Sequence, residues 1–210
     1  MHQPIFLVGM PGAGKTTIGR KLSFELNRPF TDLDEYLEMK EGVPVREIFA
    51  NRGEVYFRQA EAAALRELAV QAESGIVATG GGAPCFHQNM AFMNETGITV
   101  YLKLPVDILV ERLSGPGREY RPLVAGKTDA QINTFVTETL NARKQFYETA
   151  QITYQNVNRN RDVADLSHLI YRLETMCWGI KIRLQDGINQ IIFIFVFNYQ
   201  APFYLNYYET

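Results

Sequence analysis

The chain has little cysteine and no long hydrophobic run. Its 210 residues include only two cysteines, Cys85 and Cys177, far apart in the sequence. A disulfide scaffold and a cysteine zinc site are therefore not expected, and the composition fits a reducing compartment. The longest apolar run, IIFIFVF at residues 191–197, is too short to cross a bilayer as a helix. Because the first apolar run begins at residue 5, we expect no signal peptide and a cytoplasmic protein without a membrane partner.

The chain also lacks an excess of charge of either sign. Its formal net charge is −2 and it has no block of lysine and arginine, so a nucleic-acid partner is not expected. Hydrophobic residues make up 46% and charged residues 21%, which is typical of a soluble globular protein with a sizeable core. A length of 210 residues predicts one domain of ordinary size, with room for small insertions.

Glycine is concentrated near the start of the chain, in the stretch GMPGAGKTT. Gly9, Gly14, Lys15 and Thr16 fit the phosphate-loop pattern G-x-x-x-x-G-K-[ST]. Glycines let backbone N–H groups turn around a phosphate, and a following helix adds its free N-terminal donors. Lys15 would contact the β and γ phosphates, and the Thr16 hydroxyl would bind Mg²⁺. The alternative is a glycine-rich turn without a ligand, but the pattern should occur by chance in only about 1% of chains this long.

Short apolar runs alternate with helical patterns along the chain, which predicts an α/β fold with a mostly parallel sheet. Strands are predicted at residues 5–8, 29–33, 76–79, 99–104 and 152–154. Helices are predicted near residues 15–26, 54–73, 87–95, 106–113, 129–148 and 161–176. Residues 35–53 and 115–127 break this rhythm, and each is predicted to be an insertion at the rim of the sheet.

The last part of the chain has a different composition. Residues 177–210 are rich in Ile, Phe and Tyr with little helical period, and IIFIFVF combines high β propensity with no charge. This segment could be an added strand, a partner surface, or a tail outside the functional fold. We predict that it is a tail outside the functional fold.

Two aspartates follow the second predicted strand. In an open α/β sheet, ligands bind at the carboxyl ends of the strands, where Asp32 and Asp34 are expected to lie. They are two residues apart on an extended chain, so both point to one face. One could hold water on the metal while the other accepts a hydrogen bond from a substrate hydroxyl. The alternative is that one of them only caps the following helix.

Two further segments could complete a site. Arg58 and Glu61 are i, i+3 neighbours on a predicted helix, so the carboxylate can orient the guanidinium, although a surface ion pair is the common interpretation. The third predicted strand ends in Gly80, Gly81 and Gly82 and presents bare backbone at the ligand end of the sheet. A glycine turn without a ligand is the alternative there.

Together these residues resemble the shikimate kinase family. The phosphate loop and five further motifs occur in the family's order and at about its spacing, over residues 4 to about 175. The five are Asp-x-Asp at 32–34, F-R-x-x-E at 57–61, T-G-G-G at 79–82, R-P-L at 121–123, and Arg143 followed four residues later by Tyr147. Apart from the phosphate loop each motif alone is weak, but the set is highly specific.

The resemblance implies a P-loop α/β three-layer sandwich, with a five-stranded parallel sheet flanked by helices. It implies one domain over residues 1–176, with a substrate-binding insertion at about 33–61 and a mobile lid at about 114–127. The implied reaction is transfer of a phosphoryl group from ATP, with Mg²⁺, to the 3-hydroxyl of shikimate, in aromatic amino acid biosynthesis. A monomer is expected, with ATP and shikimate as small-molecule partners.

The resemblance also assigns roles to residues of this sequence. The ATP phosphates would be held by Gly12, Ala13, Gly14, Lys15, Thr16 and Thr17, with Thr16 also a metal ligand and Asp32 holding the metal through water. Asp34 would be the catalytic base. Arg58 and Arg143 would bind the shikimate carboxylate, Gly81 would give a backbone contact, and Phe49 and Phe57 would line the acceptor pocket. Arg121 would be the lid arginine on the ATP phosphates, while the adenine-side contact falls to Arg159 or Arg161.

Two other functions fit parts of the pattern. One is another small-molecule kinase of the same fold, acting on gluconate or a nucleotide, which the paired Arg58 and Arg143 disfavour. The other is a non-catalytic ATP-binding module, which the intact Lys15, Asp32 and Asp34 disfavour.

Overall fold

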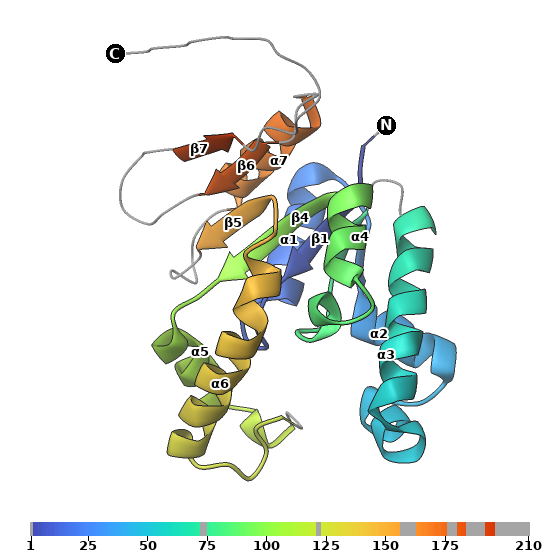
Figure 1. The fold of residues 1–210 in the computed structure, drawn as a ribbon, viewed down its shortest axis with the longest axis vertical. Helices are drawn as coiled ribbons and strands as arrows, with labels where there is room; N and C mark the ends of the chain where they lie inside the picture. The colour runs from blue at the N-terminus through green and yellow to red at the C-terminus, as the bar shows by residue number, and fades with distance from the viewer. Residues whose placement is uncertain are drawn as a thin grey trace.

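The computed structural model describes residues 2–71, 75–120, 123–155 and 163–175, together with two short strands at 180–183 and 192–195. Strands and helices alternate along the chain, and helices lie on both faces of one sheet (Figure 1). The α/β fold predicted from the alternation is therefore confirmed.

In the described part of the chain, seven strands form one sheet in the order β2-β3-β1-β4-β5-β6-β7. They are β1 (Ile5–Val8), β2 (Phe30–Asp32), β3 (Ile76–Ala78), β4 (Ile98–Lys103), β5 (Ile152–Gln155), β6 (Ile180–Arg183) and β7 (Ile192–Phe195). All neighbouring pairs are parallel except β6 and β7. The five predicted strands are thus present as five adjacent parallel strands, β2-β3-β1-β4-β5.

The helices connect these strands across the two faces. They are α1 (Lys15–Leu26), α2 (Leu33–Glu41), α3 (Val45–Gln71), α4 (Asn89–Thr96), α5 (Val106–Ser114), α6 (Asp129–Tyr147) and α7 (Ala164–Thr175), with short 3₁₀ turns η1 (Ala83–Cys85) and η2 (Arg118–Tyr120). Helix α1 packs against β2, β3 and α7, whereas α4 packs against β4. Most boundaries lie within two or three residues of the predicted ones.

Strand β1 lies at the centre of the core because its neighbours and the helices cover it completely. All four of its residues have no exposed surface. This burial on both faces explains why its sequence is a continuous apolar run rather than an alternating one. The loop that leaves its carboxyl end therefore starts from a rigid position.

The polar stretch 35–53, predicted as an insertion, is largely helical. It contains most of α2 and the first part of α3, which project from the sheet in Figure 1. Helix α3 is interrupted at Gly53, whose φ of 76° and ψ of 173° are not helical. A residue without Cβ tolerates that backbone shape, and the break matches the helix start predicted at residue 54.

The C-terminal segment 177–210 contains two strands that the predicted five-stranded sheet did not include. Strand β6 pairs in parallel with β5 at Ile152 and Thr153, and β7 pairs antiparallel with β6. Of the three interpretations of this segment, an added strand therefore describes residues 180–183 and 192–195. That the segment is dispensable for function stays a prediction, as does the domain boundary at residue 176.

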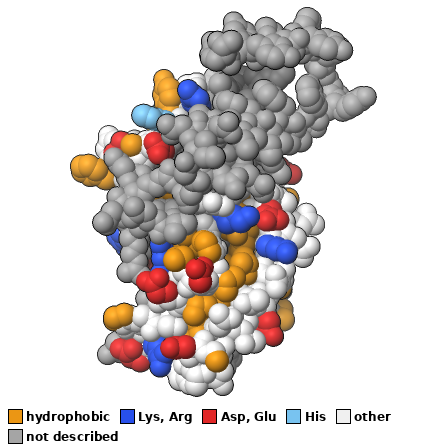
Figure 2. Space-filling view, turned by 90° about the vertical axis from the view of Figure 1, so that its left-hand side faces the viewer, with side chains coloured by type: hydrophobic (Ala, Val, Ile, Leu, Met, Phe, Trp, Pro, Cys, Tyr) orange, Lys and Arg blue, Asp and Glu red, His pale blue; other side chains and the backbone are white. Residues whose placement is uncertain are grey.

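On the surface, hydrophobic side chains are mixed with charged ones. Figure 2 shows one face on which hydrophobic side chains form a band bordered by lysine, arginine and acidic side chains. Within the described ranges, no helix combines the length and the apolar character that a membrane crossing requires.

Candidate active site

The loop between β1 and α1 presents its backbone N–H groups without side-chain obstruction. Gly9, Gly12 and Gly14 have φ values of 142°, 81° and 94°, which L side chains rarely adopt. Gly14 is the N-cap of α1, and because glycine has no side chain, no side-chain oxygen occupies the first N–H groups of the helix. The donors at the start of α1 and the positive end of its dipole are therefore available to an anion. Ala13 of the loop is buried, and Thr17 in the first turn of α1 is exposed.

Lys15 is folded back against this loop. Its ammonium group is buried and donates hydrogen bonds to the carbonyl oxygens of Gly9 and Met10, at 2.9 and 3.0 Å. Burial lowers the pKa of Lys15 to about 8, although the charges of Asp34 and Asp32 act in the opposite direction. A phosphate bound in the loop would therefore lie close to the positive charge of Lys15.

Thr16 and the two aspartates lie together at the carboxyl end of β2. The Thr16 hydroxyl donates to Asp32 Oδ2 at 2.8 Å, and the backbone N–H of Asp34 donates to Asp32 Oδ1 at 3.1 Å. Asp32 therefore both caps α2 and bonds to Thr16 at the end of the phosphate loop. Because the helix begins directly after this cap, β2 ends one residue before the predicted limit. Burial raises the pKa of Asp34, and the charge of Asp32 raises it further.

The Arg58 guanidinium is held by acids and aromatic rings. It donates to Glu61 Oε2 at 2.9 Å and to Glu54 Oε1 at 3.2 Å, with only 11% of its side chain exposed. It lies over the ring of Phe86 at 4.3 Å and over that of Phe57 at 5.0 Å. The pair of Arg58 and Glu61 is therefore buried rather than a surface ion pair.

The aromatic residues expected to line the acceptor pocket lie beside this arginine. The rings of Phe49 and Phe57 are 4.3 Å apart between centroids, and Arg58 lies 5.9 Å from the Phe49 ring. Phe86 was not predicted to contribute. It follows η1 directly, and nothing in its local sequence indicates that it faces α3.

The glycine loop after β3 approaches all of these charged groups. A Cβ at Gly80 would lie 2.8 Å from Glu61 Oε1 and 3.0 Å from Asp34 Oδ1. A Cβ at Gly82 would lie 2.7 Å from Nη2 of Arg58. A side chain at Gly80 or Gly82 would displace these charged groups, and glycine lets the backbone lie close to them. The loop therefore faces the charged groups of the candidate site, and its contact with a ligand stays a prediction.

Glu61 is the most deeply buried acid of the group, with 1% of its side chain exposed. Burial raises its pKa to about 7, against the charge and hydrogen bond of Arg58, which lower it. Asp34 adds a like charge that also favours the protonated form.

Arg143 reaches the same region from α6. It is half-buried, and its charge acts on Lys15 of α1, on Glu61 of α3 and on Cys85 of η1. The two arginines predicted to bind one carboxylate therefore belong to one electrostatic cluster, although 85 positions separate them in the sequence.

The remaining predicted residues fall on segments without a described structure. Arg121, Arg159 and Arg161 lie outside the described residues, so their roles stay predictions. In the described part of the segment predicted to form a lid, Arg118 forms an ion pair with Asp129 at 2.8 Å. Arg112 of α5 was not predicted, yet its guanidinium donates to the Ala13 carbonyl at 3.3 Å.

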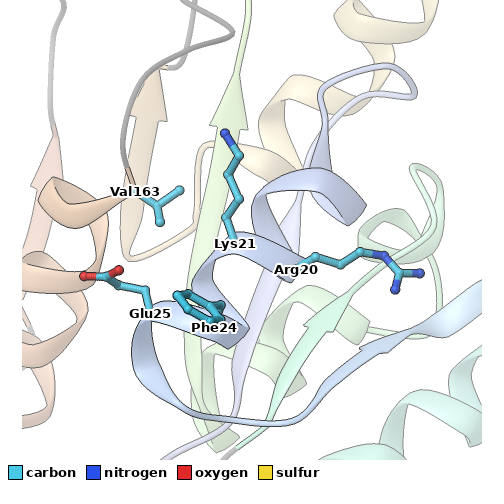
Figure 3. A pocket seen from close by; sticks show the side chains of 5 residues that line it. All are labelled: Arg20, Lys21, Phe24, Glu25 and Val163. Atoms are coloured by element: carbon cyan, nitrogen blue, oxygen red, sulfur yellow. The ribbon is translucent and has the colours of Figure 1, made fainter.

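A separate hollow of about 380 Å³ lies on the outer side of α1 (Figure 3). It is lined by Arg20, Lys21, Phe24, Glu25 and Val163. Among the described residues, none of those predicted to bind ATP or the acceptor lines it, so it is distinct from the cluster described above.

The fold and the site together define a class. A phosphate loop with a buried lysine lies beside a threonine–aspartate pair, a second aspartate and a buried arginine, all at the carboxyl edge of a parallel sheet. This is the arrangement of a P-loop kinase that transfers phosphate to a small molecule.

The family is shown by comparison with known proteins. Residues 11–174 match the family described as shikimate kinase. The shikimate kinase of Bacteroides thetaiotaomicron is 41% identical over 172 residues, covering 82% of this chain and 97% of that protein. Shikimate kinase 2 of Escherichia fergusonii is 44% identical over 154 residues, covering 72% and 82%. The chain belongs to the shikimate kinase family.

Solved structures agree. A crystal structure of the Bacteroides thetaiotaomicron enzyme has a TM-score of 0.75 and 38% identity, covering 83% of this chain and 99% of that one. The shikimate kinase of Acinetobacter baumannii, solved in complex with shikimate, has a TM-score of 0.69 and 35% identity, covering 82% and 93%. A gluconokinase from Sinorhizobium meliloti, at 18% identity and a TM-score of 0.50, shares the fold alone; it covers 82% of this chain and 93% of its own.

The raised pKa of Glu61 predicts a pH-dependent stability. The folded pKa, about 7, lies above the ordinary value of 4.5, so the folded chain holds more protons than the unfolded one between these pH values. The contribution of Glu61 to the free energy of unfolding is thus fully present below pH 4.5 and is lost as the pH rises through 7. Relative to Glu61→Gln, wild-type stability should fall by about 1 kcal/mol per pH unit across this window, measured by urea denaturation. Glu54→Gln is the control at an exposed partner of Arg58, and parallel curves for wild type and Glu61→Gln would contradict the prediction.

Proposed function

We propose that the chain transfers the γ-phosphoryl group of ATP to the 3-hydroxyl of shikimate, giving shikimate 3-phosphate and ADP. The observation that carries the proposal is the glycine loop after β3, which lies close to Asp34 and Glu61 at Gly80 and close to Arg58 at Gly82. An aspartate that would bind a hydroxyl and an arginine that would bind a carboxylate thereby lie close to one loop, which also contacts Pro11 of the phosphate loop. A small acid that carries both a carboxylate and hydroxyls fits these groups, and the related Acinetobacter baumannii enzyme has been solved with shikimate bound.

ATP would bind through the loop from Gly12 to Thr17. Its phosphates would accept hydrogen bonds from the open N–H groups, and Lys15 would exchange its bonds to Gly9 and Met10 for phosphate oxygens. Negative charge beside Lys15 would favour its protonated form. Arg121 would add a second cation when the lid closes over the phosphates.

Mg²⁺ fits the oxygen atoms of Thr16 and Asp32. Their side chains are hydrogen-bonded at 2.8 Å at the mouth of the phosphate loop, and Mg²⁺ in such sites takes one or two protein oxygens and completes its shell with phosphate and water. When bound, the ion would neutralise charge on the phosphates. Thr16 would be the direct ligand, and Asp32 would hold a metal-bound water.

Asp34 would act as the general base. The acceptor hydroxyl oxygen attacks the γ-phosphorus, the bond from this phosphorus to the ADP oxygen breaks, and the hydroxyl proton passes to Asp34. The raised pKa of Asp34 suits this role because it makes the carboxylate a stronger proton acceptor. Lys15 remains close enough to stabilise the phosphoryl oxygens as charge moves toward ADP.

The acceptor carboxylate would bind Arg58 and Arg143. Glu61 and the aromatic rings fix the orientation of the Arg58 guanidinium before any ligand arrives, which reduces the entropy lost on binding. Arginine also offers two parallel donors to a carboxylate, which lysine cannot. Gly81 would contribute a backbone contact. A cytoplasmic monomer fits the proposed reaction.

The proposed acceptor can be tested with a coupled assay of ADP release. ATP, Mg²⁺ and shikimate together should give turnover, with little ADP formed when shikimate is omitted. Gluconate and nucleoside monophosphates form the comparison panel. Faster turnover with any of them would contradict the proposal, and ATP binding without turnover on any acceptor would favour a non-catalytic module.

The base is tested by Asp34→Asn. An amide keeps the size and a hydrogen-bonding oxygen but cannot accept the proton, so kcat should fall by about 10²- to 10⁴-fold. ATP affinity, measured by calorimetry, should stay close to the wild-type value. A nearly normal kcat would mean that Asp34 has no role as a base.

The two substrate arginines are tested by Arg58→Lys and Arg143→Lys. Each keeps the charge but loses the paired donors, so the KM for shikimate should rise about 10- to 150-fold, the range for one charge-assisted hydrogen bond, while the KM for ATP stays nearly constant. Arg52→Lys is a matched control, because Arg52 lies in the part of α3 before the break at Gly53 and pairs with Glu41 at an exposed position. Arg121→Lys should instead change kcat or the KM for ATP. A rise confined to the ATP KM in Arg58→Lys would overturn the assignment.

A further inference from the structure

Tyr147 lies one helical turn after Arg143, and the proposed reaction gives it no role. It is the last residue of α6, and none of its surface is exposed. Residues four apart lie on the same face of a helix, so both side chains leave α6 toward the site. A fully buried tyrosine hydroxyl needs hydrogen-bonding partners, and the identity of these partners indicates the role of the residue.

The hydroxyl of Tyr147 connects three segments. It donates a hydrogen bond to the carbonyl oxygen of Gly81 at 2.5 Å, and the sulfur of Met10 lies 3.9 Å away. Gly81 belongs to the glycine loop and Met10 to the phosphate loop. One hydroxyl therefore joins the end of α6 to the two loops that border the proposed ATP and acceptor sites.

Arg143 interacts electrostatically with the same hydroxyl. Burial raises the pKa of Tyr147, and the charge of Arg143 with its hydrogen bond to the tyrosine acts against this rise. The phenol stays protonated at neutral pH, so it donates to Gly81, while the positive charge of Arg143 acts on its oxygen. The hydroxyl is thus bonded to the backbone of the glycine loop and interacts with the charge of Arg143.

Packing fixes the direction of this hydroxyl. The Tyr147 ring stacks on Tyr101 of β4, with centroids 5.2 Å apart and an interplanar angle of 29°. Both rings are almost completely buried, so neither can rotate away without opening the core. The position of the hydroxyl is therefore set by the sheet itself.

We propose that Tyr147 is a positioning residue, whose hydroxyl holds the Arg143 end of α6 against the Gly81 carbonyl and so sets the separation between two groups that contact the acceptor. The inference rests on the proposed roles of Arg143 and Gly81. Tyr147 would not touch the acceptor. It would determine whether Arg143 and Arg58, which come from helices far apart in the sequence, present their guanidinium groups to one carboxylate.

Tyr147→Phe removes only the hydroxyl and tests the proposal. The KM for shikimate should rise about 2- to 12-fold, the range for loss of one hydrogen bond, with the KM for ATP unchanged. Tyr101→Phe is the matched control, because it removes a hydroxyl from the other ring of the same stacked pair and should leave both KM values unchanged. Thermal unfolding of both variants reports whether the fold is retained.

A double-mutant cycle with Arg143→Lys distinguishes a positioning role of Tyr147 from a merely structural one. If Tyr147 acts through Arg143, adding Tyr147→Phe to Arg143→Lys should raise the shikimate KM by less than about 2-fold further, because coupled residues are not additive. Fully additive effects, an unchanged KM in Tyr147→Phe, equal changes in both KM values, or a variant that does not fold would each overturn the proposal.

The cycle also separates this inference from the proposed function. An Arg143→Lys variant with an unchanged shikimate KM would refute the assigned role of Arg143 itself. A raised KM in Arg143→Lys beside a normal KM in Tyr147→Phe would leave the proposed function intact and refute only the positioning role.

Discussion

The parallel pairing of β1, β3 and β2 is the constraint on which the site depends. Leu7 and Asp32 both lie beside Ala78 in the register, so the three strands end at one edge of the sheet. The N–H and the hydroxyl of Thr79 both donate to the Leu7 carbonyl, which continues the pairing beyond β3. The phosphate loop, the aspartates and the glycine loop consequently start side by side. A shift of one residue in register would displace them by about 3.3 Å, more than a hydrogen bond tolerates.

The same edge concentrates charges that burial penalises. Lys15, Asp34 and Glu61 all have pKa values moved toward the neutral form, and in each case burial is the largest cause. Opposite charges nearby offset part of this penalty, with Arg58 and Glu61 as the tightest pair. The glycine loop makes this crowding sterically possible because Gly80 and Gly82 have no Cβ. A bound anion beside Lys15 would add negative charge that favours the protonated lysine, which links stability of the site to its occupation.

Much of the fold and of the site could be predicted because the signals are local. The helix start at residue 54 follows from Gly53, and β1 follows from its apolar run. The aspartates after β2 could be recognised, but their division of labour could not, because Asp32 caps α2 and also binds Thr16, a contact across 16 positions. Phe86 and Arg112 were missed since their partners lie on other elements. An added strand in the C-terminal segment was only one of three interpretations, because the β propensity of a segment does not show which strand of the sheet it will pair with.

By itself the sequence determined the α/β alternation, the phosphate loop and the family, because each is encoded in residue spacing within one segment or in the order of short motifs. Only the tertiary structure decided which distant groups meet. It places Arg58 against Phe86 and Glu61, and Gly80 between two carboxylates. It also ties Tyr147 to the Gly81 carbonyl across 66 positions. The physical reason is that burial and hydrogen-bond geometry depend on the packing of several elements at once, whereas glycine freedom, apolar period and capping act within a few residues of the chain.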